Sequence, residues 1–234
     1  MSSRTVFIGA MLAALLAAEP GAAHDGAHEG SDQGRVSGPA DNYVFALPEP
    51  GSYRLPAIRQ AAGGPVLDEN GQAHDLADLV RGQVSVLAFI YTQCAEVCPT
   101  ATLRLAQLHD IAAADPAVLA RLRIITMSFD PEHDTAAVMG EYAEQWRGDA
   151  GAPEWLFLTA SDSVSLAPIL AAYDQTVGPS PDPNDETGQL NHVLRVFLID
   201  AEGKVRNIYS LDFLDANLVL GDVRTLLRER AGGS

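Results

Sequence analysis

The stretch VSVLAFIYTQCAEVCPT, residues 84–100, decides the fold of this 234-residue chain. Residues 84–91 are almost all apolar and rich in β-branched and aromatic types, which is typical of a strand buried on both faces of a sheet. Cys94 and Cys98 follow directly, and Pro99 favours the start of a helix because proline is tolerated in a first helical turn. The stretch therefore predicts a core strand, a cysteine loop and a helix in succession.

Strand and helix patterns alternate on both sides of this stretch. Such alternation gives a parallel core with helices on both faces, to which a terminal hairpin adds antiparallel strands. With a cysteine pair after the first core strand, we predict an α/β, thioredoxin-like fold with a central mixed sheet flanked by helices. The other predicted elements are a hairpin with its turn at 69–72, helices at 100–115, 135–146, 163–173 and 214–230, strands at 123–130 and 155–159, a loop at 177–189, and hairpin strands at 193–200 and 205–210.

The N-terminal region predicts export. Arg4 precedes an apolar run that is too short for a membrane-spanning helix, and small residues follow it, so residues 1–23 are expected to be a cleaved signal peptide. Residues 24–42 are rich in Gly, Asp and Ser and predict a flexible linker before a domain at 43–234. We expect an exported, periplasmic or other extracytoplasmic protein, without membrane attachment beyond the signal peptide. In that oxidising space, two free thiols tend to be oxidised unless another component prevents it.

The chain is strongly acidic, with a formal net charge of -16. Such a charge argues against nucleic acid as a partner, since the phosphate backbone is itself anionic. A cationic metal or a basic protein surface fits the charge better.

Cys94 and Cys98 are the only cysteines of the chain and are separated by three residues. Cys98 is expected at a helix N-terminus, where the positive end of the helix dipole favours thiolate over thiol. A redox nucleophile and a metal ligand both need that thiolate. The spacing also permits a disulfide, so the spacing alone leaves redox chemistry and metal binding open.

A third metal ligand is suggested by His192, the one histidine that immediately precedes a predicted core strand. In a thioredoxin fold, the segment before this strand borders the cysteine loop and usually carries a proline. Here it reads Gln189-Leu190-Asn191-His192, which suits metal coordination better than dithiol exchange. Two thiolates and one imidazole form a soft site that suits Cu(I) and accepts Cu(II), whereas zinc would normally take a fourth ligand.

Several motifs resemble the Sco/SenC family of copper proteins, thioredoxin-fold domains that assist assembly of the CuA centre of cytochrome c oxidase. The motifs are FIYTQCAEVCP, SFDPEHDT, WLFLT and NHVLRVFLIDAEGKV. The resemblance implies that Cys94, Cys98 and His192 are copper ligands and that Asp130 lies just behind them. It also implies a Cys94–Cys98 disulfide as the copper-free form, a thiol reductase as a partner, and a cuproprotein client such as the CuA subunit.

Two functions are therefore considered. The first is a copper metallochaperone, a binding protein without turnover. The second is a thiol-disulfide oxidoreductase that reduces cysteines of a copper-binding client. A separate hypothesis concerns the mature N-terminus, where His24 and His28 could chelate copper together with a free α-amino group.

Overall fold

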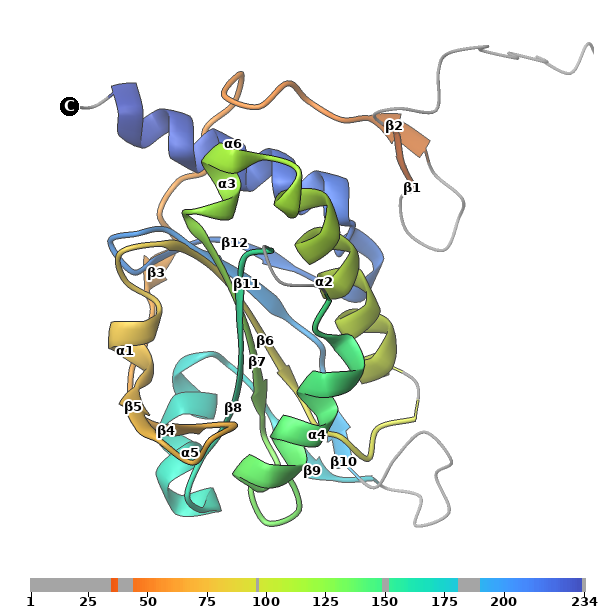
Figure 1. Cartoon of the computed structure of the whole chain (residues 1–234), viewed down its shortest axis with the longest axis vertical. Coiled ribbons are helices and arrows are strands. Elements are labelled where there is room, and N and C mark those ends of the chain that lie inside the picture. The colour runs from red at the N-terminus through yellow and green to blue at the C-terminus, as the bar shows by residue number, and fades with distance from the viewer. Residues whose placement is uncertain (1–34, 38–43, 96, 149–151, 181–189, 233–234) are drawn as a thin grey trace, which may run out of the picture. The chain divides into compact units, whose positions relative to one another are not determined.

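The structure is a computed structural model that describes residues 35–37, 44–95, 97–148, 152–180 and 190–232 (Figure 1). All of them fall in the unit formed by residues 33–234. The predicted signal peptide at 1–23, together with His24 and His28, lies outside the described residues. Of the predicted linker at 24–42, the structure describes only β1 (Arg35–Ser37), which pairs antiparallel with β2 (Val44–Ala46).

One mixed sheet of eight strands forms the centre of the domain (Figure 1). Strands β6, β7 and β8 run parallel to one another, and every other neighbouring pair in the sheet is antiparallel. The predicted parallel core and the antiparallel strands beside it are thus confirmed. In spatial order the strands are β3 (Arg59–Gln60), β12 (Lys204–Tyr209), β11 (Val196–Ile199), β6 (Val84–Ile90), β7 (Leu122–Ser128), β8 (Glu154–Thr159), β4 (Pro65–Asp68) and β5 (Ala73–Asp75).

Strand β6 lies near the middle of the sheet, between β7 and β11. All seven of its residues are buried, as its nearly continuous apolar run predicts. Its register pairs Ile90 with Ser128 of β7 on one side and Ala88 with Val196 of β11 on the other. The carboxyl end of β6, from which the cysteine loop departs, is therefore held from both sides.

Seven helical segments occur among the described residues, and α2 contacts α3, α4 and α6. The helix expected at 100–115 is confirmed as α2, which begins slightly earlier, at Val97, and ends at Ala113. Its first turn contains Cys98 and Pro99, as predicted. The helical segments are α1 (Leu76–Leu79), α2 (Val97–Ala113), α3 (Pro116–Leu119), α4 (Ala136–Trp146), α5 (Ser163–Ala172), the 3-10 segment η1 (Leu211–Phe213) and α6 (Ala216–Gly232).

Aromatic contacts show that helices cover both faces of the sheet. Phe89 of β6 packs against Tyr173 at the end of α5, with ring centroids 5.3 Å apart. Phe157 of β8 packs instead against Tyr142 of α4, at 6.1 Å. Through β7, the register aligns Phe157 with Ala88, which neighbours Phe89 and so points to the opposite face. Helices α4 and α5 therefore lie on opposite faces.

The segment before β11 differs from its prediction. Within the loop expected at 177–189, Val177–Pro179 forms β9, which pairs antiparallel with β10 (Leu190–His192). Residues 181–189 lie outside the described residues. Because β10 is a separate short strand, His192 does not immediately precede the core strand, as the apolar pattern predicted, but ends β10 ahead of β11.

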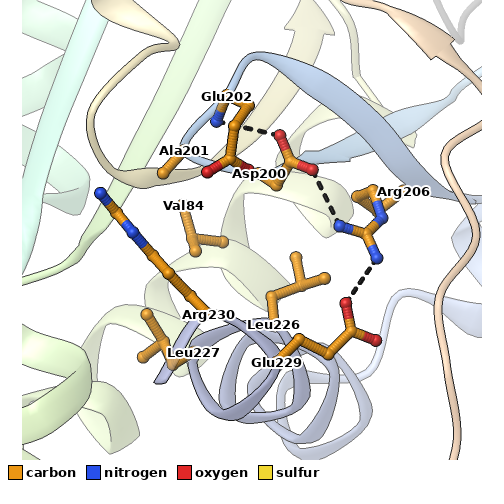
Figure 2. A pocket seen from close by; sticks show the side chains of 9 residues that line it. All are labelled: Val84, Asp200, Ala201, Glu202, Arg206, Leu226, Leu227, Glu229 and Arg230. Carbon is orange, nitrogen blue, oxygen red and sulfur yellow. Dashed lines mark hydrogen bonds and ion pairs between the residues drawn. The ribbon is translucent and has the colours of Figure 1, made fainter. Parts of the chain in front are cut away.

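An ion-pair bridge centred on Arg206 links the β11–β12 hairpin to α6 (Figure 2). Arg206 of β12 lies between two carboxylates, 2.8 Å from Asp200 and 2.6 Å from Glu229 of α6. A cavity of about 210 Å³ lies beside this bridge, with Val84, Leu226 and Leu227 as its apolar wall. The bridge fastens the terminal helix to the β11–β12 hairpin.

Replacing Arg206 by Met should lower the free energy of unfolding by about 1–3 kcal/mol, because the buried Asp200 and the partly exposed Glu229 then lose the cation that they share. Urea unfolding followed by circular dichroism measures this change. The matched control is Lys204→Met on the same strand, whose side chain is exposed and which should change stability by less than about 0.5 kcal/mol. Equal effects in both variants would show that the bridge adds nothing.

Candidate metal centre

The cysteine loop connects the end of β6 to the first turn of α2. The Cys94 amide donates to the Tyr91 carbonyl at 3.3 Å, which turns the chain immediately after the strand. Cys94 is 7% exposed and Cys98 is fully buried. Pro99 has no N–H to donate and occupies the first helical turn, where that loss is least costly. The sequence therefore places both sulfurs at the carboxyl edge of the sheet.

The two cysteines are reduced, and they interact through the helix start. The backbone N–H of Cys98 donates to the Cys94 Sγ at 3.3 Å. An N–H in the first turn of a helix points its positive end outward, so this contact favours negative charge on the Cys94 sulfur. The helix N-terminus thus stabilises negative charge on the Cys94 sulfur.

For Cys98 the sequence-based expectation of a favoured thiolate is wrong. The hydrogen bond with the Cys94 sulfur raises the pKa of Cys98 far above its usual range, burial adds to this, and the negative charge of Asp134 acts in the same direction. The sequence argument considered the helix dipole, whereas the neighbouring sulfur and burial dominate. Both sulfurs can therefore ionise fully only when a cation lies between them.

His192 is the histidine that the structure brings to the cysteines. Its Nε2 lies 3.9 Å from the Cys98 Sγ, although 94 residues separate the two in the chain. Burial lowers the pKa of His192, so the neutral ring, with a lone pair available for a metal, is the favoured form at neutral pH. The rings of Phe129 and Tyr91 pack against the imidazole, with centroids 4.6 and 6.1 Å away.

The spacing of these donor atoms is close to that around a shared metal ion. A sulfur ligand at about 2.3 Å and an imidazole nitrogen at about 2.0 Å place their own atoms about 3.5–3.7 Å apart around one tetrahedral or trigonal ion. The Cys98–His192 separation of 3.9 Å is slightly longer than this. Among the described residues, however, no three His, Cys, Asp or Glu side chains are already arranged as ligands of one ion. Binding of one ion by all three side chains would therefore need them to move closer together.

Tyr91 connects the cysteine loop to the strand that carries His192. Its hydroxyl donates to the Leu190 carbonyl at 3.3 Å and accepts from the Leu190 N–H at 3.4 Å. Tyr91 thus holds β10 next to the end of β6. Its place in the apolar run suggested only a strand residue, so sequence reasoning missed this contact.

Two aspartates follow β7, and they have different surroundings. The Asp130 carboxylate lies 2.9 Å from the His133 ring, whose pKa it raises. Asp134 is fully buried and accepts hydrogen bonds from Thr92 and Ser128. The assignment of Asp130 behind the metal ligands stays a prediction, while Asp134 is the aspartate that contacts the cysteine loop. Sequence reasoning missed this contact of Asp134 with the cysteine loop; the cap of α4 is its neighbour Thr135.

The remaining described histidines make contacts elsewhere. His74 pairs with Asp68 at 2.9 Å on the β4–β5 hairpin. His109 is buried in α2, where its Nε2 lies 3.0 Å from the Pro153 carbonyl. Neither of them reaches the cysteines through a described contact, so His192 stays the candidate third ligand.

Comparison with known proteins shows which family has this sequence pattern. The sequence profile of the SCO1/SenC family matches residues 65–228, which include both cysteines and His192. The SCO2 homologue of Bos taurus is 30% identical over 161 residues, covering 67% of this chain and 58% of that protein, and the Homo sapiens homologue is 28% identical. An SCO2-like protein of Rickettsia felis is 26% identical over 154 residues, covering 63% of this chain and 67% of its own length. The match thus spans less than two thirds of the mammalian relatives.

Solved structures agree with this fold. Copper-bound ScoI of Arabidopsis thaliana is similar with a TM-score of 0.62 and 19% identity, covering 72% of this chain and 98% of that one. Copper-bound ScoI of Bradyrhizobium japonicum has a TM-score of 0.55 and 22% identity, with 69% and 98% covered. These similarities confirm the thioredoxin-like fold. Since the family profile covers well over half of its residues, the chain belongs to the SCO1/SenC family.

Proposed function

We propose that this protein is a copper metallochaperone that carries copper on Cys94, Cys98 and His192. The observation that carries the proposal is the 3.9 Å approach of the His192 Nε2 to the Cys98 Sγ, which joins two distant segments at one edge of the sheet. Two structural relatives are described as copper-bound, which supports copper as the cargo. A role in cytochrome c oxidase assembly, with the CuA subunit or another exported cuproprotein as the client, follows from the family.

The donor set has the chemistry that copper requires. Two thiolates and a neutral imidazole are soft ligands, and copper bound to them would supply the positive charge that the buried sulfurs lack. Cys98 must lose a proton whose removal burial opposes, while the His192 ring is already held neutral by its own burial. Binding should therefore release thiol protons and compete with oxidation of the cysteine pair.

A thiol-disulfide oxidoreductase is the second candidate. It is favoured by the direct contact between the Cys98 amide and the Cys94 sulfur, which puts the two thiols within one helical turn. One solved relative is described as having a disulfide switch. In such a reaction two electrons and two protons from a thiol reductase would open a Cys94–Cys98 disulfide, and the dithiol would pass them to a client disulfide.

We propose export for the location of this activity, from the predicted signal peptide at 1–23. One structural relative, from Bacillus anthracis, is described as a lipoprotein of the SCO1/SenC family. Within the described part of the chain, no helix combines the length and the apolar character needed to cross a membrane. Detection of the mature N-terminus by mass spectrometry of the expressed protein would establish whether cleavage follows Ala23.

The His192→Ala variant should bind copper at least about 100-fold more weakly, because it loses one of three ligands and the two sulfurs then hold the ion alone. Competition of the reduced protein with a chromophoric copper chelator measures this loss. His74→Ala is the matched control, since His74 pairs with Asp68 away from the cysteines and should keep full affinity. Unchanged copper affinity in His192→Ala, with retained disulfide reductase activity, would favour the oxidoreductase.

Copper affinity should rise with pH. The folded-state pKa of Cys98 lies above its usual range, so near neutral pH the apo protein holds the thiol proton and copper must displace it. Each proton released increases the apparent affinity about tenfold per pH unit. His192 has a lowered pKa and should add its own proton competition only under acidic conditions. Chelator competition between pH 6 and pH 8 tests this, and a flat profile would contradict thiolate ligation.

A further inference from the structure

A buried carboxylate lies behind the cysteine loop and has no role in the ligand set. Asp134 is fully buried at the turn between β7 and α4. Its Oδ1 accepts the Thr92 hydroxyl at 2.5 Å, and its Oδ2 accepts the Thr92 backbone N–H at 3.0 Å. The Ser128 hydroxyl also donates to Oδ2, at 2.5 Å. Three donors thus converge on one side chain that solvent does not reach.

The hydrogen bonds around this side chain are those that a carboxylate accepts. The Ser128 Oγ already accepts the Asp130 backbone N–H at 3.0 Å, so its own proton is available to Asp134. All three partners of Asp134 act as donors, and a carboxylate that only accepts is the form that matches them. Neutral donors stabilise the charge but do not cancel it.

Asp134 forms no ion pair within the described part of the chain, and its charge contributes only a lesser part to the raised pKa of the neighbouring His133. The adjacent His133 forms its ion pair with Asp130 instead, at 2.9 Å. An unpaired buried charge is costly, and such groups are retained where they serve a site. The negative charge of Asp134 therefore disfavours additional negative charge on any group close to it.

Asp134 is connected to the cysteine pair through Thr92. Thr92, which gives Asp134 two hydrogen bonds, is separated from Cys94 by one residue. Both the position of the loop and its electrostatic potential thus depend on this carboxylate.

Building on the proposed copper site, we infer that Asp134 is a positioning residue that biases the site toward Cu(II) over Cu(I). Two thiolates and a neutral imidazole give a neutral site with Cu(II) and a site of charge -1 with Cu(I). Adding one electron from an external reductant thus creates negative charge next to a fixed buried anion, and Coulomb repulsion in a low-dielectric interior opposes that step. No bond to Asp134 and no proton transfer is needed.

The test is Asp134→Asn, which keeps the size of the side chain and removes its charge. The ratio of Cu(II) affinity to Cu(I) affinity should fall about tenfold, a rise of 59 mV in the one-electron potential. Potentiometric titration of the copper-loaded protein with ferricyanide and ascorbate measures it. Asp68→Asn is the matched control: it removes the same charge from a carboxylate that is paired with His74 on the β4–β5 hairpin, and it should shift the ratio by less than about threefold.

Thr92→Val separates charge from anchoring, because it removes the hydroxyl donor but leaves the carboxylate. Hydrogen exchange of the Thr92 amide in the copper-free protein should be faster in both Asp134→Asn and Thr92→Val, whereas only the former should lower the affinity ratio. An equal fall of the ratio in Thr92→Val, or no difference between Asp134→Asn and Asp68→Asn, overturns the inference.

A different result would contradict the proposed function: the reduced wild-type protein would bind neither Cu(I) nor Cu(II). If Asp134→Asn does not fold, Ser128→Ala replaces it. Loss of one donor leaves the carboxylate charge less stabilised, so the affinity ratio should rise at least about threefold. An unchanged ratio in that variant also overturns the inference.

Discussion

The pairing of β6 on both sides is the constraint on which the rest of the structure depends. With β7 parallel on one side and β11 antiparallel on the other, β6 cannot shift without breaking two ladders, and all of its side chains are buried. Its last residue therefore has a fixed position. The cysteine loop, the first turn of α2 and the contact of Tyr91 with Leu190 are all built outward from that point.

The chemistry at this edge is a balance between two opposing effects on neighbouring sulfurs. The Cys98 amide favours charge on Cys94, while the Cys94 sulfur, burial and Asp134 disfavour charge on Cys98. One thiolate is thus supported and a second is opposed in the metal-free protein. An arrangement of this kind holds soft ligands together while leaving their joint ionisation to depend on an added cation.

Local patterns in the sequence predicted much of the fold, and contacts between distant segments account for what they missed. The apolar run of β6, Pro99 and the β11–β12 hairpin follow from nearest-neighbour preferences and are confirmed. The β9–β10 pair was read as a loop because its strands are three residues each and carry no apolar alternation. The raised pKa of Cys98 and the burial of Asp134 arise from packing between segments, which spacing along the chain does not encode.

The place of His192 divides the candidate site into parts of unequal stability. The cysteines are attached to an eight-stranded sheet and a long helix, whereas His192 ends a two-stranded ribbon. Two strands alone are marginally stable, so the ribbon can open at a lower free energy than the whole domain. The candidate site therefore combines a half that is fixed to the core and a half that can separate from it, so that the two halves can move apart without unfolding of the domain.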